Sequence, residues 1–181
     1  SKWFVGSATA SISANGSAED AAAAVNALTA STGVTATAKT LARFGTMSAA
    51  GTVTFNIGSA TADKEAAISV AVTDVSDLRG IKDAINAVAL TTGITAEMTS
   101  GSNASMTLTH QEGADIMISD FLVGVSATTM KLDGLDAYGA NTTAGTTQIT
   151  LQSAANVASD VFDDAVVNGH LALNSHKTFT V

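Results

Sequence analysis

Histidines are the residues of this sequence whose types and spacing could bind a metal or transfer a proton. The chain has three of them, His110, His170 and His176. Two metal ligands on one helix face stand four residues apart, whereas His170 and His176 are six apart. No Cys is present, and no well-placed carboxylate completes a set of ligands. We therefore expect exposed or structural histidines and no metal.

Aspartates form two clusters that could hold a hard cation such as calcium. Asp160, Asp163 and Asp164 fall on a segment with a helical pattern, where two carboxylates could share one face. Asp133 and Asp136 flank a turn, but the spaced oxygen ligands of a calcium loop are missing there. A solvated acidic surface accounts for both clusters, and we expect no metal and no cofactor at either.

Motifs for covalent or phosphate chemistry are missing as well. The sequence has no Gly-x-Ser-x-Gly elbow, no Gly-x-Gly-x-x-Gly and no phosphate-binding loop. Only 4% of the residues are aromatic, which disfavours a stacking platform for sugars or bases. We therefore predict no catalytic and no cofactor-binding residues, and a protein that is not an enzyme.

Composition narrows the partners and the kind of core. The net charge of −8 argues against nucleic acid and against anionic membrane surfaces. Uninterrupted apolar runs such as residues 21–25 are far shorter than the roughly 20 residues that span a bilayer. Ala, Thr, Ser and Gly make up about half of the chain, so we expect a core of small side chains in thin layers.

An internal repeat with an offset of 60 residues is the most informative feature. Residues 24–36 read AVNALTASTGVTA, and residues 84–96 read AINAVALTTGITA. The constant offset aligns Asn26 with Asn86, Thr32 with Thr92, and Gly33 with Gly93. Two copies of one supersecondary unit explain this match.

Each copy predicts one helix. In the second copy the apolar residues stand three or four apart, which defines one helix face: Leu78, Ile81, Ile85 and Val88. Ser76 or Asp74 is its expected N-cap, and Gly93 is expected just past its end. In the first copy Ser17 and Asp20 have the spacing of a capping box, and Gly33 ends the helix. The stripe of this first helix is Ala21, Val25 and Leu28.

Alternating apolar and polar residues predict the strands. They cover residues 52–57, 68–73, 94–98, 106–108 and 116–118, and in the last third residues 130–135, 149–151, 171–173 and 179–181. Val157, Val161, Phe162, Ala165 and Val166 fit a further helix closed by Gly169. The predicted class is α+β, with repeated two-layer modules of antiparallel strands and one packed helix each. We expect no long terminal coiled-coil helices. The predicted segments are residues 1–50, 51–122 and 123–181, the last completing the domain.

The second copy resembles the IN motif of bacterial flagellins. The string DLRGIKDAINAVALTTGITAEM follows the hairpin TFNIGSATADKEAAISV and precedes MTLTH and DIMIS. The motif is named for an Ile-Asn pair, here Ile85-Asn86, followed by Thr-Gly-Val/Ile-x-Ala, here Thr92 to Ala96. The clear resemblance covers residues 52–119, and a degenerate first copy extends it to about residue 10.

The resemblance implies a surface-exposed central domain of flagellin, outside the cell, that contributes to the filament exterior, motility and antigenicity. Its implied partners are other flagellin subunits, contacted through terminal helices for which this sequence has no pattern, with antibodies or a host surface as further partners. We therefore expect an isolated monomer. Two alternatives stay open: an IN-motif domain of a filament-cap or hook-associated protein, and an adhesin or phage-tail module that binds a surface.

Sugar attachment is a further expectation that the resemblance brings. O-linked sugars on exposed Ser or Thr would fall on two loops, residues 101–105 and 141–147. Asn103 and Asn141 also match the N-glycosylation pattern, which in a bacterial protein is usually a chance match. Unmodified polar loops are the simpler interpretation of both segments.

Overall fold

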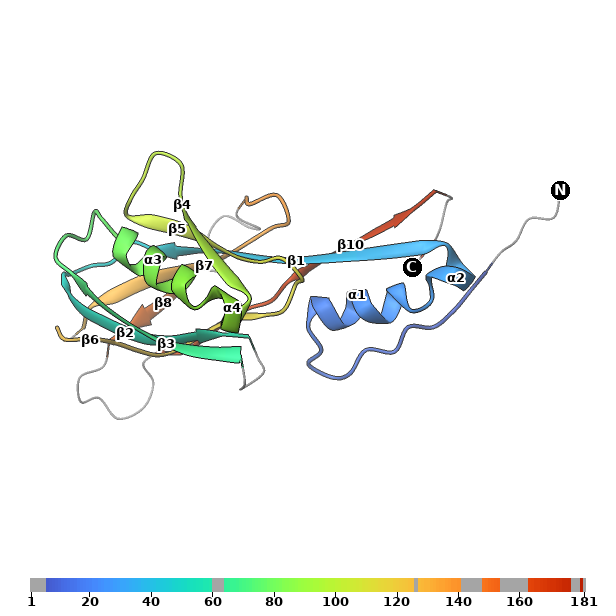
Figure 1. The fold of residues 1–181 in the computed structure, drawn as a ribbon, viewed down its shortest axis with the longest axis horizontal. Coiled ribbons are helices and arrows are strands. Elements are labelled where there is room, and N and C mark those ends of the chain that lie inside the picture. Colours follow the sequence, from blue (N-terminus) through green and yellow to red (C-terminus); the bar gives the residue numbers. More distant parts are fainter. Residues whose placement is uncertain are drawn as a thin grey trace.

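The computed structural model describes residues 6–59, 64–125, 127–140, 148–153, 163–176 and 180. These residues form two antiparallel sheets and four short helices, whose arrangement can be followed in Figure 1. The helices are α1 (Ala18–Asn26), α2 (Thr29–Thr32), α3 (Arg79–Ala87) and α4 (Ala89–Thr92). The strands are β1 (Val34–Gly45), β2 (Gly51–Gly58), β3 (Glu65–Val72), β4 (Ile94–Met98), β5 (Ser105–His110), β6 (Ile116–Val123), β7 (Thr129–Leu135), β8 (Gln148–Gln152), β9 (Ala165–Val167) and β10 (His170–Ser175).

The α+β class predicted from the sequence is confirmed. One sheet has the order β4-β5-β1-β7-β8, and the other has the order β3-β2-β6-β9. Every strand pair in both sheets is antiparallel. The longest helices of the described ranges have nine residues, so these ranges contain no long coiled-coil helix.

Strand β1 connects the two ends of the molecule (Figure 1). Its first half, residues 34–39, pairs with β10. Its second half lies between β5 and β7 in the middle of the first sheet. The strand is not predicted from the sequence, because its first half alternates Thr with the weakly hydrophobic Ala36 and Ala38.

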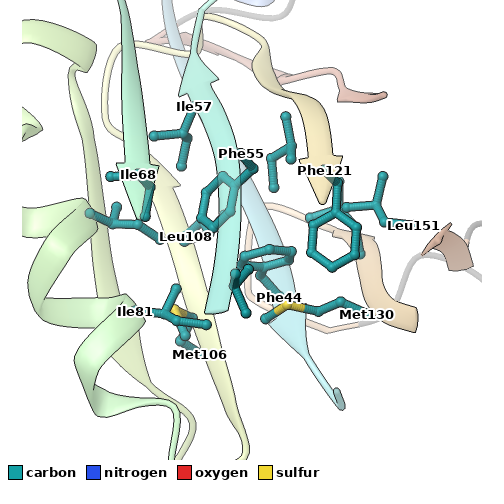
Figure 2. Packing of buried hydrophobic residues seen from close by; sticks show 14 of the residues in the cluster. Phe44, Phe55, Ile57, Ile68, Ile81, Met106, Leu108, Phe121, Met130 and Leu151 are labelled. Atoms are coloured by element: carbon teal, nitrogen blue, oxygen red, sulfur yellow. The ribbon is translucent and has the colours of Figure 1, made fainter. Parts of the chain in front are cut away.

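The main core lies between the two sheets (Figure 2). The rings of Phe44 and Phe55 come from opposite sheets and meet edge to face, with centroids 5.5 Å apart. Such a pair contributes about 1 kcal/mol beyond the area that it buries. Phe121, Met130 and Leu151 extend the same cluster. A few large side chains therefore anchor a core in a chain that is otherwise rich in small residues.

Helix α3, from the second copy of the repeat, packs its apolar side chains into this core. Leu78, Ile81 and Ile85 are fully buried, as the helical spacing predicted. The helix contacts β3 of one sheet and β4 of the other. It therefore closes the side of the sandwich on which both sheets end.

Two local predictions are corrected by the structure. Neither Ser76 nor Asp74 caps α3: the carboxylate of Asp74 accepts hydrogen bonds from Ser76 instead, and the N-cap is Leu78, without a side-chain bond. Residues 165–167 form strand β9 and not the end of a helix, because they pair with β6. The rest of that predicted helix, residues 157–162, and the predicted strand at residues 179–181 lie outside the described residues, apart from Thr180, which is in no strand.

Candidate functional site

The aligned asparagines of the repeat make the same pair of hydrogen bonds. Asn86 donates from Nδ2 to the carbonyl of Ala96 at 2.9 Å and accepts the Ala96 N–H on Oδ1 at 2.8 Å. Asn26 holds Ala36 in the same way, with the same two distances. Each amide thus satisfies both backbone groups of a strand residue that lies ten positions further along the chain.

The aligned threonines and glycines shape the turn between helix and strand. Thr92 donates to the carbonyl of Val88 at 3.2 Å and accepts the N–H of Ile94 at the same distance. Gly93 follows with φ of 73°, a left-handed conformation that suits glycine. The predicted glycine stops are confirmed, although a separate four-residue helix stands between each longer helix and its glycine.

The first copy repeats this turn and adds two side-chain bonds, one of which runs from the hydroxyl of Ser31 to the carbonyl of Leu28 at 2.9 Å. Thr32 bonds to Leu28 and Val34, and Gly33 has φ of 69°. In addition, the hydroxyl of Thr29 donates to the carbonyl of Val34 at 2.8 Å. The aligned residue of the second copy is Ala89, which has no hydroxyl to donate.

The capping box predicted for the first helix is confirmed. The hydroxyl of Ser17 accepts the N–H of Asp20, and the Asp20 carboxylate accepts the N–H of Ser17. Only Ala21 and Ala22 of this helix are buried. The first helix is therefore well terminated but contributes much less apolar burial than α3.

His110 is buried at the end of β5, and only 3% of its surface is exposed. Its Nδ1 accepts the N–H of Ala114 at 3.2 Å, which leaves the proton of the neutral ring on Nε2. Burial lowers the pKa of His110, while the charges of Glu19 and Glu112 raise it and that of Lys64 lowers it. This side chain is a structural histidine held in its neutral form.

A shallow pocket of about 240 Å³ opens beside this ring, lined by Lys64, Leu90, Thr91, Gly93, His110, Gln111 and Glu112. Gly93 has a second reason to be glycine here, because a Cβ on it would lie 2.5 Å from Nε2 of His110. The ring therefore packs directly against the end of the repeat.

The other two histidines lie elsewhere. Nε2 of His170 is 2.9 Å from the carbonyl of Leu135, and His176 is exposed. Among the described residues, no three His, Cys, Asp or Glu side chains are grouped closely enough to hold a metal ion. The three histidines therefore do not converge on one site.

The two predicted acidic clusters have structural contacts. The backbone carbonyl of Asp163 accepts the N–H of Phe121, and the carboxylate of Asp164 accepts the N–H of Asp120. Both residues precede β9 rather than lying on a helix, and Asp160 lies outside the described residues.

In the second cluster, Asp133 lies in β7 and accepts a hydrogen bond from Gln148 at 3.3 Å. Asp136 follows the strand, and its Oδ1 accepts the N–H groups of Tyr138 and Ala140, each at 2.9 Å. These bonds fix a tight turn, which presents Tyr138 to solvent.

The loop at residues 101–105 belongs to the structure around α3. The carbonyl of Asn103 accepts the N–H of Leu78 at 2.8 Å, while its side chain is exposed. The second loop proposed for sugar attachment, residues 141–147, lies outside the described residues.

Comparison with known proteins identifies part of this architecture. Residues 5–49 match the family described as the flagellin hook IN motif. The match falls on the first copy of the repeat, the one that the sequence marks as degenerate, and not on residues 52–119. A comparison with curated protein sequences finds no match.

Two solved structures from Escherichia coli are similar to this chain. The D1-D2-D3 domains of the flagellar cap protein FliD match over 80% of this chain and 52% of that chain, with 15% identity and a TM-score of 0.33. The D2-D3 domains of the same protein match over 80% of this chain and 94% of that chain, with 14% identity and a TM-score of 0.31. This chain thus spans about half the length of the first of these structures.

The described part of the chain contains no helix with the length and hydropathy needed to cross a membrane. The turn at Gly33 and the amide bonds of Asn26 lie within the matched residues, and Gly93 and Asn86 repeat the same geometry outside them. The resemblance to flagellin IN motifs is therefore confirmed for residues 5–49, whose sequence matches the flagellin hook IN motif.

Proposed function

We propose that this chain is a structural component of the bacterial flagellum, located outside the cell, and that it forms the surface-exposed central domain of a flagellin. The observation that carries the proposal is the flagellin hook IN motif at residues 5–49. The second copy, with the same bonds from Asn86 to Ala96, supports it. The domain would add to the filament exterior, motility and antigenicity.

The charge of the chain fits a position on the outside of a filament. With a net charge of −8, neighbouring filaments would repel one another in water, which favours dispersion. In this proposal the subunits assemble through terminal regions outside this sequence, and the isolated chain is a monomer. Residues 1–50, 51–122 and 123–181 remain the proposed segments of the domain.

We also infer that the role is not enzymatic. The described ionisable side chains with named contacts serve the fold: His110 bonds to Ala114, and Asp136 holds its own turn. A mechanical role requires a stable shape rather than a reactive group. Strand β1 stabilises the shape of the chain, because it pairs with β5, β7 and β10.

A second candidate is an IN-motif domain in a filament-cap or hook-associated protein. The description of the matched motif names the hook as well as flagellin, which favours keeping this candidate. The two candidates differ in position, because flagellin covers the whole filament whereas a cap or hook-associated protein occupies only an end of it.

Immunogold electron microscopy of flagellated source cells tests the proposal. Antibodies raised against the 181-residue chain should label filaments along their whole length. Label confined to the filament tip or to the junction with the hook would contradict the flagellin assignment and favour the cap or hook-associated protein. Flagella that carry no label, while the same antibodies detect the protein in those cells, would overturn both assignments.

Antibody preabsorbed with the purified chain is the control for nonspecific label. Cells stripped of flagella by shear provide a second control, since the antigen should move from the cell pellet to the sheared fraction. An antigen that stays with the stripped cell bodies would contradict a position on the filament.

A further inference from the structure

Strand β4 is an edge strand of the first sheet. In an antiparallel strand, the N–H and C=O of one residue point to the same side, and successive residues alternate. The N–H of Thr99 bonds to the carbonyl of Ser105 at 3.0 Å, which continues the ladder with β5. The backbone groups of Ile94, Ala96 and Met98 therefore point away from β5, toward the open edge.

The polar residues of the repeat occupy this edge. Asn86 takes both backbone groups of Ala96, and Thr92 takes the N–H of Ile94. The primary amide of Asn86 presents one N–H donor and its C=O acceptor on the same side, so it bonds to both backbone groups of Ala96 as a residue of a neighbouring antiparallel strand would. Helix α3, which carries Asn86, lies against β4.

The first copy does the same to the first half of β1. Because Asn26 takes both backbone groups of Ala36, β10 must bond to β1 through the alternate residues. Thr32 and Thr29 take the N–H and the C=O of Val34 on the Asn26 side. Strands β1 and β4, in different parts of the fold, thus each have one edge occupied by the aligned Asn and Thr side chains of the repeat.

We propose that Asn86 and Asn26 are edge locks, each of which closes a strand edge against pairing with a second copy of this chain. Unpaired strand edges are templates for strand addition, and natural proteins block them by several devices. Here the device is a helix fastened to the edge by an asparagine amide. The proposal concerns the isolated chain and does not depend on the flagellar assignment.

A second copy is the partner that β4 fits. A two-fold antiparallel pair centred on Ala96 sets Ile94 opposite Met98 and Thr95 opposite Glu97 of the other molecule. The pair avoids opposing Glu97 with its own copy, so like charges do not prevent it. The sequence of β4 is thus compatible with self-pairing. Helix α3 and Thr92 cover the same edge, and Asn86 is the side chain that takes both backbone groups at the centre of the pair.

Sedimentation of variants tests this proposal. Asn86→Ala should convert a monomer into a dimer whose population rises with protein concentration. Asn103→Ala, which removes an exposed amide from a loop, is the matched control and should stay monomeric. Thr95→Glu added to Asn86→Ala would set two carboxylates opposite each other across the pair and should restore the monomer. An Asn86→Ala protein that is monomeric at all concentrations, or a dimer that survives Thr95→Glu, would overturn the proposal.

Hydrogen exchange of the Ala96 amide gives a second readout under dilute conditions, where dimers are absent. Exchange should become about tenfold faster in Asn86→Ala, the loss expected for one hydrogen bond. Asn86→Asp keeps the acceptor for this amide and should preserve its protection.

If Asn86→Ala does not fold, Asn86→Asp carries the test of dimer formation. At neutral pH its carboxylate repels the Ala96 carbonyl, and protonation of the carboxylate restores a hydrogen-bond donor. Its dimer should therefore disappear on acidification, and a dimer that is insensitive to pH would reject the lock.

Discussion

At the scale of single residues, His110 links the repeat to the turn that follows β5. Its ring lies against Gly93 on one side, and its Nδ1 accepts the N–H of Ala114 on the other. The hydrogen bond from Ala114 requires the neutral ring, because a proton on Nδ1 would remove its acceptor. The contact with Gly93 is compatible with the neutral ring. The spacing of histidines in the sequence excluded a helical metal pair, but it held no signal for this packing role.

We predict that protonation of His110 destabilises the fold. Burial lowers the pKa of His110 below its ordinary value of 6.5, so the unfolded chain binds the proton first as the pH falls. The stabilisation is therefore complete above pH 6.5 and is lost as the pH falls below it, with a slope of at most about 1.4 kcal/mol per pH unit. Urea unfolding between pH 7.5 and 5.5 measures this loss.

His110→Gln should flatten that pH dependence, since no buried imidazole then remains to be protonated. His176→Gln is the matched control, because His176 is exposed, and it should leave the profile as it is. Identical profiles for the native chain and His110→Gln would contradict the prediction.

At the scale of elements, the repeat could be predicted from the sequence, but its longer-range hydrogen bonds could not. The offset of 60 residues located both helices and both glycine stops, because these depend on neighbouring residues. The target of Asn86 lies ten residues away across a turn, and no local pattern could name it. The helix expected at residues 157–166 fails where Ala165 and Val166 pair with β6, because tertiary pairing overrides a short apolar spacing.

Thr29 of the first copy aligns with Ala89 of the second, so one hydroxyl can be removed from one copy and added to the other in a matched experiment. Thr29→Val removes the bond to the Val34 carbonyl while keeping a β-branched side chain, and should lower the free energy of unfolding by about 1 kcal/mol. In the second copy, Ala89→Thr should be more stable than Ala89→Val by a similar amount. Denaturant unfolding of the four proteins, native included, measures both differences.

The two valine variants are the controls, since they separate the hydroxyl from the helix propensity of a branched residue. Equal stability of Ala89→Thr and Ala89→Val would mean that the extra bond does not form in the second copy. Equal stability of Thr29→Val and the native chain would mean that the first copy gains nothing from it.

At the scale of the whole molecule, one strand joins two regions of unequal packing (Figure 1). The second half of β1 lies in the sandwich, where Phe44 is fully buried against Phe55. The first half pairs only with β10 among the described strands, and α1, which packs against it, has only Ala21 and Ala22 as buried residues. Small side chains bury little area, so this end should open without unfolding the sandwich.

Native-state hydrogen exchange along β1 tests that expectation. The Thr37 amide, opposite β10, should exchange through a smaller opening free energy than the Ala42 amide, opposite β5. Met130→Ala removes a fully buried core side chain and should lower the opening free energy at Ala42 by about 2–5 kcal/mol. It should leave Thr37 unchanged, because the sandwich stays folded when only the β10 end opens. Leu173→Ala, in β10, should lower the opening free energy at both amides, since it destabilises the native state relative to both openings. Met130→Ala could instead lower the opening free energies at Thr37 and Ala42 equally. Strand β1 would then open in one cooperative step, and the β10 end would not open independently of the sandwich.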